Sequence, residues 1–156
     1  MEKLTSVQAW ELLNKDELTE EEIKRLVAEE KWDFSGYSNI TIPESFQYMT
    51  DLLILDLSLC SISTIPEEIG NLTSLQILNL GYNRVDTIPI ETGKLINLKS
   101  LDLRGNNMSE VPVSICALSN LEGLNLSNNM LVKIPDEIAS LTHLKVLCLS
   151  GNKMQK

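Results

Sequence analysis

The side chains able to perform acid–base or metal chemistry are few in this chain, and its one imidazole has no evident chemical partner. His143 is the single histidine among 156 residues, and it lies in the segment SLTHL. A catalytic imidazole needs a nucleophile or an orienting carboxylate within reach, and the surrounding residues supply neither in a specific pattern. We therefore expect His143 to be a solvent-exposed loop residue without a catalytic role.

Carboxylates recur at a fixed interval and form a second candidate for chemistry. Asp33, Asp56 and Asp102 are separated by multiples of 23 residues and share their position with Asn79 and Asn125. Carboxylates stacked on adjacent strands about 4.8 Å apart could raise a pKa or hold a cation. The asparagines interrupt this acidic row and dilute its charge. We expect a solvated row of Asp and Asn side chains rather than a metal site.

The cysteines and the short motifs argue against catalysis. Cys60, Cys116 and Cys148 are odd in number and widely spaced, which fits neither a disulfide framework nor a zinc site. The sequence also contains no phosphate-binding loop, helical H-E-x-x-H pair or C-x-x-C pair. We expect a protein that is not an enzyme and that binds no cofactor or metal.

Charge and composition exclude several kinds of partner. The net charge is −9 and the sequence pI is about 4.6, so nucleic acid and anionic membrane surfaces would be repelled. No apolar segment is long enough to span a membrane, and the N-terminal segment has no apolar run typical of a secretory signal. We expect a cytoplasmic protein, with a secreted effector as the alternative.

Most of the chain consists of an internal repeat of 23 residues. Each unit begins with L-x-x-L-x-L, as in LKSLDL at 98–103. Five residues after the second leucine of this motif, a polar slot recurs, and an Ile-Pro or Val-Pro pair follows in four of the units. The leucines that begin the units are Leu52, Leu75, Leu98, Leu121 and Leu144, and the polar slot holds Cys60, Asn83, Asn106, Asn129 and Asn152.

This pattern resembles that of the leucine-rich-repeat proteins, whose repeats are 20–29 residues long. The second half of the unit, as in IPEEIGNLTSL, is similar to the intracellular 23-residue subclass found in Scribble and Erbin. The resemblance covers residues 32–156, including a degenerate first unit and an incomplete last one. It implies an α/β fold, a right-handed arc-shaped solenoid with a parallel concave sheet and an irregular or 3-10 convex side.

The spacing of side chains explains how such a repeat folds. In L-x-L the leucines point inward and the residues between them point outward, and stacked units share one core. A buried asparagine amide can satisfy turn backbone groups of neighbouring units. Cys60 occupies the same slot, and we expect its thiol to form weaker hydrogen bonds than the asparagine amides. Thr92 occupies a slot that holds isoleucine at Ile69, Ile115 and Ile138, and we expect it to loosen the core locally.

The two ends of the chain differ from the repeats. In residues 1–31, Thr5 with Gln8 and Thr19 with Glu22 have the spacing of capping boxes, which predicts two short helices. We expect residues 1–31 to form a helical cap and residues 32–156 to form the repeat domain. The last repeat lacks its second half, so an open edge strand is available for self-association.

The outward strand positions form the candidate binding surface. Tyr82 and Arg104 fall on adjacent strands, and both residue types are enriched at interaction hot spots. We predict a protein or peptide partner on the concave face. The candidate contact residues are Asp56, Leu59, Asn79, Tyr82, Asp102 and Arg104.

The leading hypothesis has two alternatives. The resemblance implies a scaffold or adaptor module, since members of the subclass commonly act in signalling. The alternative is the substrate-recognition domain of a larger enzyme, such as a leucine-rich-repeat ubiquitin ligase or a receptor kinase, or a pathogen effector that targets a host protein.

Overall fold

Short parallel strands, one from each repeat, form a single sheet in the order of the sequence. The computed structural model describes residues 3–154, so the outer limits of the predicted domains, residues 1 and 156, lie outside the described residues. Over this range the predicted fold is confirmed. The strands are β1 Lys31–Asp33, β2 Ile54–Asp56, β3 Ile77–Asn79, β4 Ser100–Asp102, β5 Gly123–Asn125 and β6 Val146–Cys148.

The strand register keeps equivalent residues side by side. Leu55 pairs with Leu78, which pairs with Leu101 and then with Leu124, so the offset is 23 residues at each step. These leucines are buried, while the residues before and after them in each strand point to the opposite face. The inward row is the centre of the core, and the outward rows form the concave surface.

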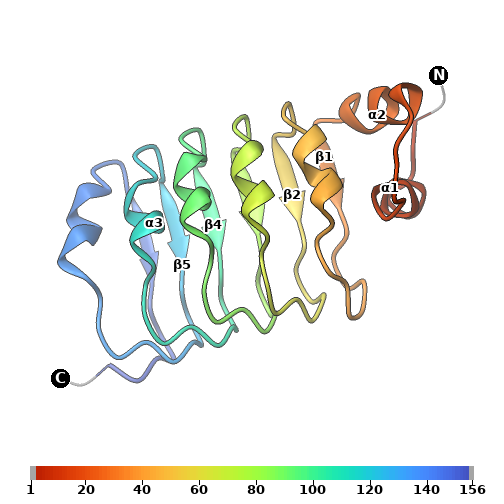
Figure 1. Cartoon of the computed structure of the whole chain (residues 1–156). Helices are drawn as coiled ribbons and strands as arrows, with labels where there is room; N and C mark the ends of the chain where they lie inside the picture. Colours follow the sequence, from red (N-terminus) through yellow and green to blue (C-terminus); the bar gives the residue numbers. More distant parts are fainter. Residues whose placement is uncertain (1–2, 155–156) are drawn as a thin grey trace.

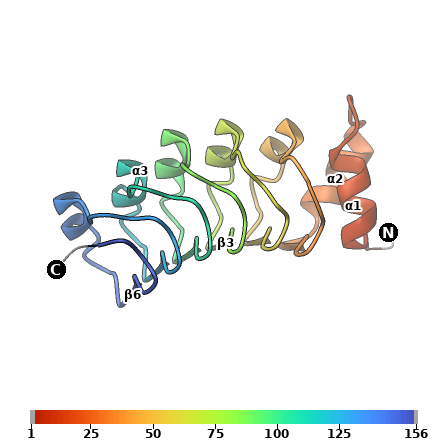
Figure 2. The same cartoon turned by 90° about the horizontal axis from the view of Figure 1, so that it is seen from below.

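Short helical turns form the other side of the solenoid, as Figure 2 shows. Each follows a proline at its N-cap, for example Pro66 with φ −73°. Proline has no N–H to donate and its φ is already helical in range, so it suits this extended approach to a turn. The turns are η1 Glu44–Tyr48, η2 Glu67–Asn71, η3 Ile90–Lys94, α3 Val113–Cys116 and η4 Asp136–Ser140.

The asparagine ladder predicted from the polar slot is present. Asn106 donates from Nδ2 to the carbonyls of Leu80 and Leu103 at 2.9 and 3.0 Å, and its Oδ1 accepts from the N–H of Val85 at 2.9 Å. One amide therefore satisfies backbone groups of two repeats. The same arrangement recurs at Asn83, Asn129 and Asn152.

Two positions depart from the regular core, as the sequence indicated. Cys60 takes the asparagine slot and its thiol donates to the Phe34 carbonyl at 3.1 Å, but sulfur is a weak hydrogen-bonding group. Thr92 is buried in an isoleucine slot. Among the described residues, its hydroxyl and that of Ser114 are the two buried side-chain oxygens or nitrogens without a hydrogen-bond partner.

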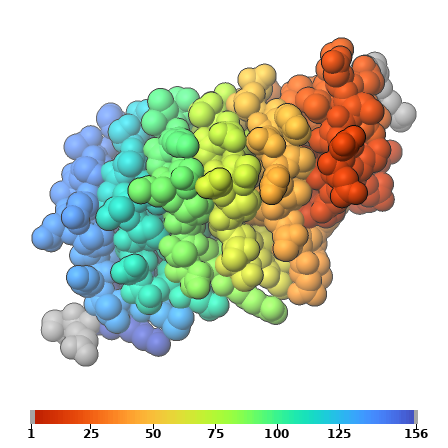
Figure 3. All heavy atoms as spheres, viewed as in Figure 1, coloured from red at the N-terminus to blue at the C-terminus, as the bar shows by residue number. Residues whose placement is uncertain are grey.

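The helices α1 Ser6–Leu13 and α2 Glu20–Val27 pack against the first repeat (Figures 1 and 3). Both begin with the predicted capping boxes, at Thr5 and at Thr19. The Trp10 ring of α1 meets the Phe34 ring with centroids 5.0 Å apart, and Leu26 of α2 is buried. In residues 3–154, none of the helices has the length and apolar character needed to cross a membrane.

The opposite end of the sheet is open within the described residues. Strand β6 pairs with β5 on one side, and none of residues 3–154 pairs with its other side. Leu147 is 37% exposed, whereas the equivalent Leu124 is 1% exposed. Core side chains at this edge therefore contact solvent.

Candidate functional site on the concave face

The Asp/Asn row has a structural role that its sequence pattern did not reveal. Asp56 Oδ1 accepts hydrogen bonds from the backbone N–H and the hydroxyl of Ser58, at 2.9 and 2.7 Å. Side chains that bond to the backbone two residues ahead stabilise turns. The row is therefore part of the strand-to-loop turns, a role that adds to the solvated row expected from the sequence. The other members that bond two residues ahead are Asp33, Asn79, Asp102 and Asn125.

The electrostatics of this row follow from those bonds. The hydroxyl and N–H of Ser35 donate to Asp33 and hold the pKa of that carboxyl below its usual range. Asp56 Oδ2 accepts from Asn79 Nδ2 at 2.9 Å, so neighbouring strands are joined across the face. In the part of the chain that the structure describes, no group of three or more His, Cys, Asp or Glu residues is placed to hold a metal ion.

A second row lies where each strand leads into its loop, and its backbone is left-handed. Tyr82 has φ 55° and Leu59 has φ 59°, although bulky side chains rarely adopt this conformation. Glycine, which adopts it freely, fills the slot in other repeats. The row consists of Gly36, Leu59, Tyr82, Gly105, Asn128 and Gly151.

Tyr82, Arg104 and Asp102 form one contacting group, hereafter the Tyr82 cluster. The Arg104 guanidinium carbon lies 4.8 Å from the centroid of the Tyr82 ring, a cation–π arrangement. The Arg104 Nε lies 3.4 Å from Asp102 Oδ2. The tyrosine ring remains 46% exposed, so the cluster is both ordered by contacts and open to solvent.

Two glycines make room for this cluster. A Cβ added at Gly105 would lie 2.6 Å from Cδ1 of Tyr82, and one added at Gly81 would lie 3.4 Å from Cγ of Arg104. The ring and the arginine stem therefore lie directly on bare backbone. The sequence did not reveal that these glycines lie beneath the ring and the arginine stem, because the contact depends on side-chain direction.

The six predicted contact residues fall into three groups. Arg104 contacts both Tyr82 and Asp102, and Asp56 is hydrogen-bonded to Asn79 on the adjacent strand. Leu59 is exposed one repeat before Tyr82 in the left-handed row.

On the same concave face, the beginnings of strands β3 to β6 form an open apolar hollow of about 340 Å³. Ile77 and Val146 stand at its sides, and the small residues Ser100 and Gly123 form its floor. Lys99, Glu122 and Lys145 lie along one rim, where Lys145 donates to Glu122 at 2.7 Å and lowers the pKa of that carboxyl. The signal for this hollow in the sequence is one strand position at 23-residue spacing. It holds Ile77, then the small residues Ser100 and Gly123, and then Val146.

His143 and the three cysteines occupy positions that hydrogen bonding and packing explain. His143 is exposed as expected, and its Nδ1 lies 2.9 Å from the Ser119 carbonyl. Asn120 makes the equivalent bond one repeat earlier, so His143 belongs to a second inter-repeat ladder. Burial raises the pKa of the Cys60 and Cys116 thiols, and the three cysteines are free.

The distribution of aromatic residues was a further signal that sequence reasoning missed. Six of the seven precede residue 50, and Tyr82 is the seventh. The early aromatics Trp10, Phe34 and Phe46 pack around the first repeat. Tyr82 instead lies exposed on the concave face, where no core packing requires a ring.

The parallel sheet, the 23-residue register and the buried asparagine ladder together define a leucine-rich-repeat solenoid. A family model described as a leucine-rich repeat region matches residues 34–156. The chain therefore belongs to the leucine-rich-repeat family. No curated protein sequence matches it significantly.

Several solved structures are similar to this chain in sequence and shape. A leucine-rich-repeat protein of Leptospira interrogans is 32% identical with a TM-score of 0.80, over 90% of this chain and 36% of the other. The plant peptide hormone receptor RGFR1, solved in complex with RGF2, is 30% identical with a TM-score of 0.73, over 84% of this chain and 22% of the receptor. The chain thus spans well under half the length of these two relatives.

A third comparison concerns the fold alone. An internalin of Listeria monocytogenes, InlF, is 24% identical with a TM-score of 0.78, and the match covers 97% of this chain and 44% of the internalin. The helices before the first repeat are included in that range of this chain.

Proposed function

We propose that this leucine-rich-repeat domain is a non-catalytic module that binds a protein or peptide on its concave face. The observation that carries the proposal is the Tyr82 cluster. It presents a tyrosine ring and an arginine already held together on the surface, so little side-chain freedom is lost on binding. Tyrosine and arginine are also the residue types most often found at hot spots.

The surroundings of the cluster support a macromolecular partner. Six strands at a spacing of about 4.8 Å give a face roughly 24 Å long, which is the scale of one side of a standard interface. The hollow between Ile77 and Val146 is sized for an apolar side chain of the partner. Arg104 and Tyr82 would then contact the partner chain next to that side chain.

The relatives favour the same class of partner. RGFR1 was solved in complex with RGF2, and that receptor is one of the 30%-identical relatives. We further propose that the chain acts in the cytoplasm as an adaptor or scaffold of the Scribble and Erbin type, because its repeats have the same 23-residue IPxxIxxLxxL form. A recognition part of a longer enzyme or an effector is the competing proposal.

The test uses residues that other repeats already carry. In Tyr82→Gly/Arg104→Ser, glycine matches Gly36, Gly105 and Gly151, and serine matches Ser58, Ser127 and Ser150. Both replacements suit the local backbone, so the variant should fold. Wild type and variant would be used as bait in the organism's lysate, captured proteins would be identified by mass spectrometry, and the purified partner would be titrated against both.

Binding at least tenfold weaker to the variant is the expected result. A matched control, Glu91→Gln, changes one charge on the opposite side of the solenoid and should leave this affinity unchanged. Equal binding to wild type and the double variant would place the interaction elsewhere and would overturn the concave site.

Self-association is a second candidate, favoured by the exposure of Leu147 at the open edge of β6. Unpaired strand edges readily accept another strand. Sedimentation velocity over a range of concentrations would test it, with Leu147→Lys as the variant that should remain monomeric. Identical sedimentation of wild type and variant would exclude this edge as a contact.

A further inference from the structure

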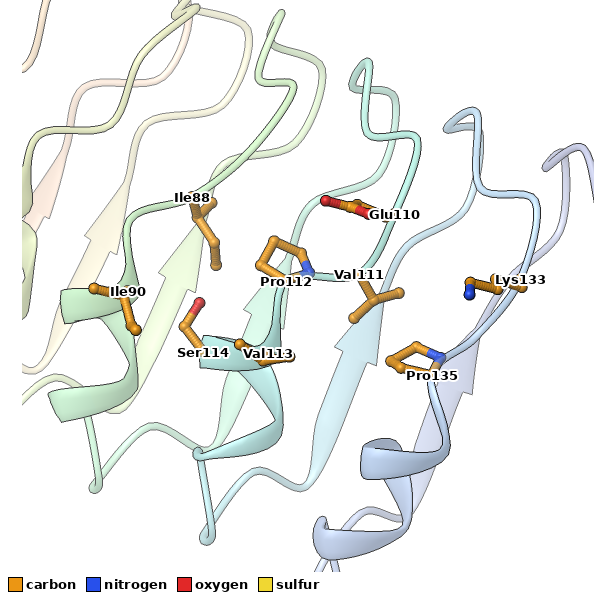
Figure 4. Close-up of a pocket in the computed structure, with 9 residues that line it drawn as sticks. All are labelled: Ile88, Ile90, Glu110, Val111, Pro112, Val113, Ser114, Lys133 and Pro135. Atoms are coloured by element: carbon orange, nitrogen blue, oxygen red, sulfur yellow. The ribbon is translucent and has the colours of Figure 1, made fainter.

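The side of the solenoid opposite the sheet carries a groove that the concave site does not use. It has a volume of about 380 Å³ and lies between η3, α3 and the approach to η4. Figure 4 shows its lining residues converging from three successive repeats. They are Ile88, Ile90, Glu110, Val111, Pro112, Val113, Ser114, Lys133 and Pro135.

The exposed apolar residues of this groove replace acidic ones. The first residue of the helical turn is Glu44 in η1, Glu67 in η2 and Asp136 in η4. Acidic residues are favoured there by the positive end of the helix dipole. In η3 and α3 the same position holds Ile90 and Val113, which are 72% and 60% exposed. Local stability does not explain these two replacements, because both side chains face solvent.

A buried hydroxyl in the groove wall is the second observation. The Ser114 side chain is 4% exposed, and its Oγ has no hydrogen-bond partner in the structure. Figure 4 shows this oxygen directed away from α3 toward Ile88 and Pro112. The equivalent residues in η2, η3 and η4 are the glutamates Glu68, Glu91 and Glu137. A partner that opens the wall slightly can satisfy the hydroxyl, which is costly to leave unpaired.

The charges around the groove select the kind of partner. The turns from η2 to η4 and the groove walls carry six carboxylates, and two lysines, Lys94 and Lys133, oppose them. A polar cleft lined by Glu67, Glu68 and Glu91 lies directly on the N-terminal side. The acidic residues are Glu67, Glu68, Glu91, Glu110, Asp136 and Glu137.

We propose that this groove is a second docking surface, for a protein segment that inserts an apolar side chain flanked by lysine or arginine residues. Ile90, Val113 and the prolines provide an apolar seat, and the carboxylates on both sides attract the flanking cations. The concave and convex surfaces lie on opposite sides of the sheet, so both partners can bind one molecule together.

The experiment uses three seven-residue peptides with blocked ends. The first has a central leucine with a serine on each side and two lysines at each end (KKSLSKK). The second replaces the leucine by glycine, and the third replaces the lysines by glutamates. Each is titrated into the ¹⁵N-labelled protein, and amide shifts in ¹H–¹⁵N spectra give the location and the affinity. We expect saturable shifts around Ile90 and Val113 with the first peptide only.

The decisive variant is Ile90→Glu/Val113→Asp, which carries the residue types that η2 and η4 have at this position. It should fold, and it is more acidic than wild type, so purely electrostatic attraction would make the lysine peptide bind more tightly. The proposal expects at least tenfold weaker binding, because the apolar seat is lost. Equal or tighter binding would overturn it.

Two further outcomes also decide the matter. Equal shifts from the glycine or glutamate peptides, or shifts centred on the concave face, would contradict the proposal. Tyr82→Gly/Arg104→Ser should bind the lysine peptide as wild type does, which keeps this test independent of the concave site. Ser114→Ala should weaken binding of the lysine peptide about two- to fivefold, because the bound peptide loses a hydrogen bond to this hydroxyl.

Discussion

At the N-terminal end the stack of repeats is held by aromatic rings, whereas from residue 75 onward it is held by leucines and asparagine amides. Phe34 makes ring contacts with Trp10, Trp32, Tyr37 and Phe46. In the later repeats, Asn83, Asn106 and Asn129 bond backbone groups of adjacent units.

The difference follows from the number of neighbours that each unit has. An internal repeat is covered on both sides by copies of itself, so one small amide can serve two units. The first repeat has a copy on one side only, and its other side must be covered by the unlike surface of α1 and α2. Large rings fill such irregular space and need no matching register. The N-terminal end of this solenoid is thus stabilised by packing volume, and its interior also by repeated hydrogen bonding.

The largest effect is expected at the centre of the aromatic end. Phe34→Ala should lower the free energy of unfolding by about 4 kcal/mol, because a fully buried ring with four aromatic neighbours is replaced by a cavity. Urea unfolding followed by circular dichroism would measure this. Leu101→Ala, in the middle of the sheet, is the control, and a larger loss there would contradict the assignment of the end as the more packing-dependent region.

The second-largest loss in the free energy of unfolding is expected in the asparagine ladder. Asn106→Ala should cost about 3 kcal/mol, since the Val85 N–H and the Leu80 and Leu103 carbonyls lose their partner while buried. Cys60→Ala, in the same slot of the aromatic end, should cost about 1 kcal/mol. If the two variants lost the same free energy of unfolding in urea titrations, hydrogen bonding at this slot would not distinguish the two regions.

One substitution in the core of a later repeat is expected to stabilise the protein. Thr92→Val keeps the shape of the side chain and removes a buried hydroxyl without a partner. We expect the free energy of unfolding to rise by about 1 kcal/mol. Thermal unfolding by calorimetry would show a higher Tm, and an unchanged or lower Tm would mean that the hydroxyl has a partner in solution.

The smallest effect is electrostatic and is confined to the helical end. Lys15 donates to Glu22 and, with the Thr19 bonds, lowers the pKa of Glu22 from 4.5 to about 2. A depressed folded pKa means that this contribution is present above pH 4.5 and is lost as the pH falls toward 2. Glu22→Gln keeps the capping box, as Gln8 does in α1, and removes only the charge.

The measurement is the stability difference between wild type and Glu22→Gln across that pH range. A small difference at pH 6 should disappear by pH 2, whereas the cost of Asn106→Ala should not follow this titration because an amide has no charge. A Glu22→Gln difference that is constant with pH would show that the carboxylate does not contribute through its ionisation.

Regular features of the fold were predictable because each was sampled several times along the chain. The leucine spacing and the asparagine slot recur in successive units, so their burial and bonding could be inferred from period and chemistry. The capping boxes at Thr5 and Thr19 were equally clear, since their partners lie three residues away.

Features that depend on side-chain direction were not predictable. The row containing Asp56 and Asn79 was expected to be solvated, and its bonds to the following backbone depend on loop dihedrals. Tyr82 was proposed as a contact residue, but a left-handed tyrosine resting on Gly105 has no sequence signature. The convex groove was not predicted. Ile90 and Val113 lie outside the strands, and the sequence alone does not show that their side chains line one groove.

The shared register also determines how the chain can be rebuilt. Every strand pair is offset by one 23-residue period, and the ladder bonds of Asn106 between repeats join residues 21 or 26 positions apart. Excising residues 75–97 would join Ser74 to Leu98 and recreate the same junction, because Leu98 is equivalent to the removed Leu75. A deletion of 22 or 24 residues would instead turn inward leucines outward. The molecule can therefore be shortened or extended in whole units without redesigning the core, and this excision would replace Tyr82 by the equivalent Leu59 in the position next to Arg104.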